Sequence, residues 1–145
     1  MTTITKPKKG SLVVGSKKAD KINIKKAYKN LNINSKNGND TIVVNNSNKK
    51  VTINAGNGKN KIDMVNTVGK ASVVSGSGND TINVYALSKK KKVTAKNGNY
   101  DIKAGNGNNV INVNSNGNFN ITTGKNNDKV TITGNGTHKI NLGNG

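Results

Sequence analysis

The residues that most favour a binding function are lysines. All 24 basic residues are Lys, all six acidic residues are Asp, and the net charge is +18. Such a charge attracts polyanions such as acidic polysaccharide, anionic cell wall, lipid headgroups or nucleic acid. The candidate residues are Lys25, Lys26, Lys49, Lys50, Lys89, Lys90, Lys91 and Lys92. The alternative is a solvated surface that keeps a β-rich protein soluble and its strand edges unpaired.

The residue types give little support for nucleic-acid binding, catalysis or phosphate binding. Nucleic acid is the least expected polyanion, because Arg is absent for base reading and only 3% of residues are aromatic. His138 is the only histidine, and no nucleophile, base and orienting group occur together. The GxG runs lack a following GK[ST], so no phosphate loop is predicted. We therefore expect a protein that is not an enzyme. No apolar run approaches the roughly 20 residues of a transmembrane segment.

Regularly spaced aliphatic residues predict the elements that position these side chains. Their intervals alternate between 9 and 11 residues as far as Val93, and afterwards are 9 or 10. A second apolar residue usually lies two positions away, which is the period of a β-strand with one buried face. The predicted core positions are Val13, Ile22, Ile33, Ile42, Ile53, Ile62, Val73, Ile82, Val93, Ile102, Ile111, Ile121, Val130 and Ile140.

This spacing predicts an all-β fold, a two-sheet parallel β-solenoid of about seven coils of 18–20 residues. Alternate positions belong to alternate sheets, so Ile102 should align with Ile82. Short Gly/Asn turns form one edge, and longer Lys-rich connections form the other until the last third, where that edge also takes short turns. The predicted domains are a flexible basic arm, residues 1–10, and the solenoid, residues 11–145.

Several of the short turns resemble a known calcium-binding repeat. Residues 75–84, SGSGNDTINV, resemble the RTX (hemolysin-type calcium-binding) nonapeptide GGxGxDxUx, in which U is a large apolar residue. Gly76, Gly78, Asp80 and Ile82 fill the second Gly, third Gly, Asp and U places. The resemblance covers about residues 11–145. It implies a β-roll-like solenoid with Ca²⁺ bound between neighbouring turns.

The resemblance also implies candidate metal ligands, which are Asp20, Asp40, Asp80 and Asp128. Other turns carry a different residue in the Asp place, namely Asn60, Tyr100, Asn109, Phe119 and His138. Because Ca²⁺ needs roughly six to eight oxygen ligands, several of them carboxylates, full loading is not expected. We expect no required cofactor, with Ca²⁺ at one or two weak sites near Asp20 and Asp40 or near Asp80.

The repeat running through nearly the whole chain favours a structural role. We expect a non-enzymatic, extracellular repeat protein of a bacterial surface, acting as a rigid spacer or a self-associating fibre or matrix subunit. Its partners would be further copies end to end, or the rest of a longer parent chain. Two alternatives stay open: an adhesin module that binds an anionic polysaccharide or cell surface through its Lys-rich edge, and an RTX module with few residual calcium sites.

Overall fold

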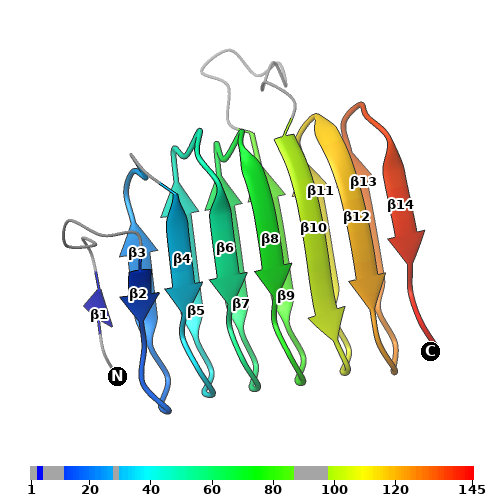
Figure 1. Cartoon of the computed structure of the whole chain (residues 1–145). Helices are drawn as coiled ribbons and strands as arrows, with labels where there is room; N and C mark the ends of the chain where they lie inside the picture. Colours follow the sequence, from blue (N-terminus) through cyan, green and yellow to red (C-terminus); the bar gives the residue numbers. More distant parts are fainter. Residues whose placement is uncertain (1–2, 5–11, 28–29, 87–97) are drawn as a thin grey trace.

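A computed structural model describes residues 3–4, 12–27, 30–86 and 98–145. These residues form two parallel seven-stranded sheets that wind into a β-solenoid of about six turns (Figure 1). Sheet A contains β1 (Thr3–Ile4), β3 (Lys21–Ile24), β5 (Thr41–Asn45), β7 (Lys61–Val65), β9 (Thr81–Tyr85), β11 (Val110–Asn114) and β13 (Lys129–Thr133). Sheet B contains β2 (Leu12–Val14), β4 (Leu31–Asn34), β6 (Val51–Asn54), β8 (Lys70–Val74), β10 (Gly98–Gly105), β12 (Gly117–Thr123) and β14 (His138–Asn141).

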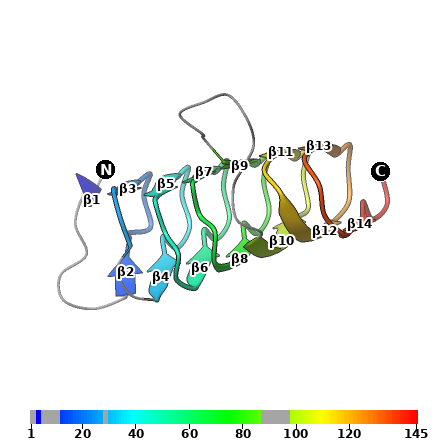
Figure 2. The same ribbon diagram turned by 90° about the horizontal axis from the view of Figure 1, so that it is seen from above.

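The predicted fold class is confirmed, and the strands stack in register. Equivalent residues of successive coils pair directly, so Ile42 lies between Ile22 and Ile62 in sheet A. In sheet B, Ile53 lies between Ile33 and Val73 in the same way. Figure 2 shows the two sheets facing each other across a thin interior. Because parallel pairing satisfies the backbone of each coil on its neighbours, a narrow aliphatic layer is enough of a core.

Most of the aliphatic residues predicted from their spacing to form the core are buried between the two sheets. The following are at most 2% exposed: Ile22, Ile33, Ile42, Ile53, Ile62, Val73, Ile82, Ile102, Ile111 and Ile121. In the last coil Val130 is only partly buried and Ile140 is 46% exposed. Among the described residues no strand lies beyond β13 and β14, so one side of this layer stays uncovered.

The sheet assignment that follows Val93 is wrong. Ile102 pairs with Val73 in sheet B, not with Ile82, and Ile111 takes the place beside Ile82. Equivalent residues are therefore 29 positions apart at this coil, as in the hydrogen bond from Ser75 Oγ to the Ala104 carbonyl. The prediction counted Val93 as a core position between Ile82 and Ile102. Val93 lies outside the described residues, as do Lys89 to Lys92. The five later aliphatic positions consequently occupy the opposite sheets from those predicted.

The 29-residue coil also changes which edge the later turns occupy. Residues 104–109 and 123–128 form short turns at the same edge as the earlier Gly/Asn turns, not at the other edge as predicted, because the Gly107 N–H donates to the Lys125 carbonyl just as the Gly78 N–H donates to the Asn106 carbonyl. The other edge does take short turns in the last third, but through residues 115–116 between β11 and β12 and 134–137 between β13 and β14. The turns stack closely enough to require glycine. At Gly78, where φ is +134°, a Cβ would lie 2.2 Å from the carbonyl oxygen of Gly58.

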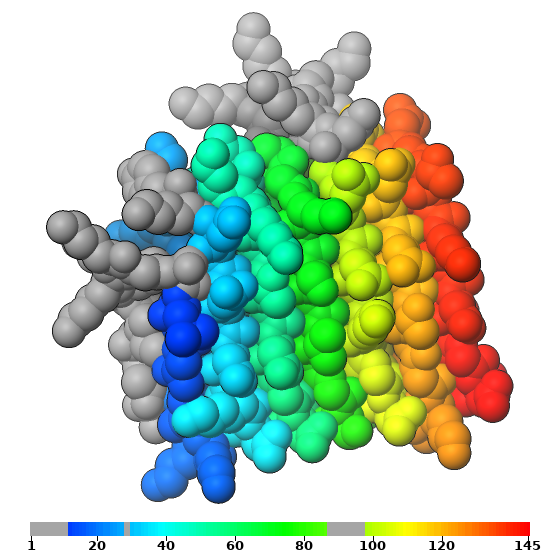
Figure 3. All heavy atoms as spheres, viewed as in Figure 1, coloured from blue at the N-terminus to red at the C-terminus, as the bar shows by residue number. Residues whose placement is uncertain are grey.

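One strand falls within the segment assigned to the N-terminal arm. Thr3 and Ile4 form β1 and pair with Lys21 and Ile22 at the edge of sheet A. Figure 3 shows the opposite sheet in space-filling form, with the strands of successive coils packed as parallel bands. Within the described ranges, no helix is long and apolar enough to cross a membrane.

Candidate functional site

The short-turn edge carries a buried ladder of aspartate and asparagine side chains. At each step a side-chain Oδ1 accepts the backbone N–H of the equivalent residue one coil earlier. The donor–acceptor distances are 2.8 Å for Asp20 to Asp40, 3.1 Å for Asp40 to Asn60, 2.8 Å for Asn60 to Asp80, 3.0 Å for Asp80 to Asn109 and 2.9 Å for Asn109 to Asp128. We call this set the turn ladder. It unites all four predicted metal candidates with two of the asparagines that stand in the Asp place.

The asparagines of the turn ladder satisfy the turn carbonyls by themselves. Asn60 Nδ2 donates to the carbonyls of Gly56, Gly58 and Ser75 at 3.2, 3.1 and 3.2 Å. Asn109 Nδ2 makes the matching bonds within its own turn, to Gly105 and Gly107 at 3.1 and 3.0 Å. An amide group therefore occupies the position that faces the carbonyl oxygens, and these turns close without an ion.

The aspartates of the turn ladder are left with an unpaired oxygen. Oδ2 of Asp40, Asp80 and Asp128 is buried and accepts no hydrogen bond from the described residues. Burial raises the pKa of Asp40 above its ordinary value, while the nearby Ser35 side chain and the N–H of Asp20 lower it in part. Burial likewise raises the pKa of Asp80, against the opposing N–H of Asn60. Asp20 differs, because its carboxylate accepts hydrogen bonds from the Ser16 backbone N–H and hydroxyl.

The turn ladder supplies too few carboxylates for the calcium loading that the RTX resemblance implies. Asn60 and Asn109 interrupt it on both sides of Asp80, and each presents N–H groups where a cation would need oxygen. Among the described residues no group of three or more His, Cys, Asp or Glu could hold a metal. The pair Asp20 and Asp40 is the one place where two carboxylates follow each other in the ladder.

Three residues that the sequence analysis assigned to the Asp position of a turn do not belong to the turn ladder. Tyr100, Phe119 and His138 stand in one column of sheet B, where Tyr100 pairs with Phe119 and Phe119 with His138. The first two rings stack at 4.5 Å with an angle of 3°, and the next two lie 5.5 Å apart at 51°. The Tyr100 hydroxyl donates to the Thr67 carbonyl. These turn-like sequences therefore lead into aromatic core residues, since the 29-residue coil moved them to the other sheet.

The structure divides the predicted lysine stripe between two surfaces. Lys25, Lys26, Lys49 and Lys50 are all exposed. Lys26 and Lys49 line one hollow of about 450 Å³ beside the longer connections, together with Asn46 and Asn66. Lys50 instead lines a different hollow on the outer face of sheet B.

Comparisons of the chain with protein-family models, with curated proteins and with solved structures found no match. The parallel β-solenoid is compatible with a β-roll.

Proposed function

We propose that this protein is a non-enzymatic structural repeat, a stiff spacer or fibre subunit of a bacterial surface or extracellular matrix. The observation that carries the proposal is the continuous, in-register pairing of both sheets from the first described strand to the last. At roughly 4.8 Å per strand, seven strands extend about 29 Å along the solenoid axis. Bending such a stack requires breaking backbone hydrogen bonds in both sheets at once.

The last coil supports assembly along the same axis. Ile140 and Leu142 are 46% and 44% exposed, and Val130 and Ile132 are only partly buried. The outer edge of a parallel strand also presents backbone groups that can pair with a further strand. A following coil, from a longer parent chain or from a second copy, would cover this end in the geometry that the coils already use.

Particle size tests the assembly. We expect sedimentation or electron microscopy of the full chain to show length distributions that grow with concentration. Changing Ile140 and Leu142 to Lys should shorten the particles, because charge at the stacking end opposes contact. Thr81→Lys, on the outer face of sheet A and away from the last coil, is the control and should leave them unchanged. A monomer at every concentration would reject self-association and leave only the spacer role.

A polyanion-binding adhesin module is the second candidate. The placement of Lys26 and Lys49 around one hollow favours it, since two cations then face one bound group. Retention on a heparin column should fall in Lys26→Ser/Lys49→Ser and should weaken steeply with salt. Equal retention of the variant and the parent protein would reject this edge as the binding surface.

Residual calcium binding is the third candidate, and the unpaired Oδ2 atoms of Asp40 and Asp80 favour it. A cation beside either carboxylate would offset its burial. Circular dichroism with Ca²⁺ and with a chelator tests the proposal. We expect a β spectrum in both, with a modest rise in the unfolding temperature on adding Ca²⁺. Complete loss of β signal in chelator would instead indicate calcium-dependent folding.

A further inference from the structure

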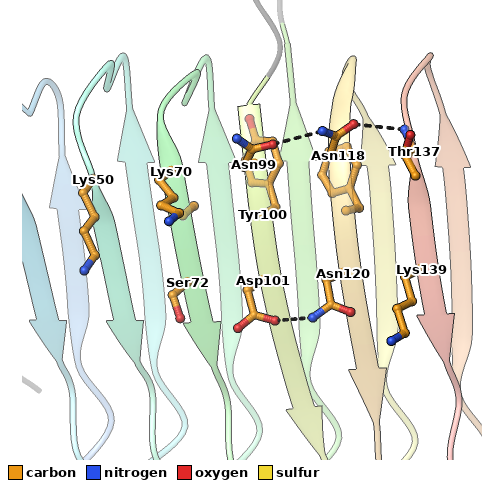
Figure 4. A pocket seen from close by; sticks show the side chains of 12 residues that line it. Lys50, Lys70, Ser72, Asn99, Tyr100, Asp101, Asn118, Asn120, Thr137 and Lys139 are labelled. Carbon is orange, nitrogen blue, oxygen red and sulfur yellow. Dashed lines mark hydrogen bonds between the residues drawn. The ribbon is translucent and has the colours of Figure 1, made fainter.

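The outer face of sheet B carries a hollow that no sequence motif indicated. Its volume is about 490 Å³, and it crosses β8, β10, β12 and β14 (Figure 4). The floor lies where Ala71, Tyr100 and Phe119 turn their side chains into the core, so only their backbone side faces the solvent. Because these strands stack in register, the hollow runs along the solenoid axis. We call it the sheet-B groove.

Two rows of outward polar side chains form its walls. In one row Asn118 Nδ2 donates to Asn99 Oδ1 at 3.2 Å, and in the other Asn120 Nδ2 donates to Asp101 Oδ1 at 2.8 Å (Figure 4). The rows are two residues apart along each strand, which corresponds to roughly 6.6 Å. At that spacing one extended chain lying along the groove can contact both rows. Each of the two donating amides has a second N–H that these bonds do not use.

The charges of the groove favour an anion. Lys50, Lys70 and Lys139 line it, and all three are exposed. Asp101 is the acidic residue among its walls, and that carboxylate already accepts a hydrogen bond from Asn120. Figure 4 shows Lys50 and Lys70 toward one end of the groove and Lys139 toward the other, with the amide rows between them. A ligand that spans the groove would therefore meet cations near both ends.

We propose that the sheet-B groove binds one extended strand of an acidic polysaccharide. Carboxylates of the sugar chain would meet the ammonium groups, each of which acts as a compact point charge. Sugar hydroxyls both donate and accept hydrogen bonds, which suits the two amide rows. The strands repeat at roughly 4.8 Å along the axis, so a linear chain lying along the rows meets one polar side chain of each row at every strand. Of the described lysines predicted to form the basic stripe, Lys50 also lines this groove.

Other extended polymers fit less well. A single-stranded nucleic acid needs exposed rings for base stacking, and Tyr100 and Phe119 are 3% and 0% exposed. A peptide that adds a β-strand needs unpaired backbone groups, and β10 and β12 are each paired on both sides. The groove therefore offers side-chain contacts to a polar, charged chain.

Binding of a linear uronate polymer, measured by calorimetry on the full chain, tests the proposal, with a neutral linear glucan as the comparison. Lys70→Ser/Lys139→Ser should weaken uronate affinity about tenfold. Lys21→Ser/Lys129→Ser removes the same charge from sheet A and should change the affinity by less than about twofold. An equal loss in both variants would show general attraction by net charge and would overturn the groove. So would equal binding of the glucan.

A second pair of variants changes shape without changing charge. Ser72→Tyr places a ring in the groove and should abolish most uronate binding, whereas Thr41→Tyr, on the outer face of sheet A, should not. Circular dichroism verifies that each variant keeps its β spectrum. Unchanged binding in Ser72→Tyr, or loss only in Lys26→Ser/Lys49→Ser, would refute the groove in favour of the edge. Sedimentation or electron microscopy tests the structural role without any polysaccharide. A failure of that role is therefore distinguishable from a failure of groove binding.

Discussion

At the residue scale, the turn ladder shows how a single side-chain atom determines whether the polar groups of a turn are all hydrogen-bonded. Asn60 and Asp80 occupy equivalent places, and each accepts the N–H of the preceding coil through Oδ1. The second atom differs. In Asn60 it is an N–H₂ group that donates to three carbonyls, whereas in Asp80 it is a buried oxygen without a partner. A buried unpaired acceptor is costly, so the aspartates lower stability at neutral pH.

We expect Asp80→Asn to raise the free energy of unfolding by about 1–3 kcal/mol, since the new amide can donate as Asn60 does. The reverse change, Asn60→Asp, should lower it by a similar amount. Urea unfolding at pH 7 measures both. Asp101→Asn makes the same charge change on the outer face of sheet B and should shift the value by less than about 0.5 kcal/mol. A destabilised Asp80→Asn protein would contradict this account of the ladder.

The raised pKa values of Asp40 and Asp80 predict a dependence of stability on pH. The folded chain holds these protons more tightly than the unfolded chain, in which the pKa is near 3.8. Their contribution to stability is therefore full below that value and is lost as pH rises through the folded pKa. Thermal unfolding between pH 4 and pH 7 should show this fall, and Asp40→Asn/Asp80→Asn should flatten it. Identical slopes for both proteins would refute it.

At the scale of the element, each strand depends on the coils on either side of it. Ile62 is fully buried and pairs with Ile42 and Ile82, whereas Ile140 lies in the last strand and is 46% exposed. The two residues have the same type and both lie at predicted core positions, so they separate the effect of coverage from that of side-chain identity.

Ile62→Ala should cost about 3 kcal/mol, because it removes buried methylene groups and leaves a cavity between two covered coils. Ile140→Ala should cost about 1 kcal/mol or less, since much of that side chain already meets solvent. Chemical denaturation compares the two variants, with the exposed Lys61→Ala as a control near zero. Equal losses at Ile62 and Ile140 would mean that the last coil is covered in solution, as in an assembled particle.

At the scale of the molecule, stability is the sum of nearly identical interfaces between coils. Removing one whole coil joins strands that already share a register, because Lys61 pairs with Thr41 and Ile62 with Ile42. Removing half a coil sends every later strand to the opposite sheet and turns its polar face inward.

Deletion of residues 41–60 should therefore give a folded protein of lower unfolding temperature. Deletion of residues 41–50 should give a chain without protease resistance. Circular dichroism and limited proteolysis of both variants measure the difference. If the half-coil deletion were as resistant as the whole-coil deletion, the register would not govern the fold.

The positions of the strands were determined by the sequence itself. Aliphatic residues two apart, at intervals near ten, leave a polar chain only one way to bury them, which is to stack as paired strands. The repeat of Asp and Asn after short turns likewise identified the members of the turn ladder. These features are local, so the spacing of residue types is enough to find them.

The tertiary structure alone decided which strands became neighbours. Val93 matches the interval, yet Ile102 pairs with Val73, because hydrogen bonding across the sheet and the stacking of Tyr100 on Phe119 join residues far apart in the chain. The sheet-B groove arises in the same way, from residues that only the stacking of coils brings together. The orientation of the Asn60 side-chain amide is also set by the carbonyl groups of its own turn and of the next coil. The spacing of residues along the chain does not predict these contacts.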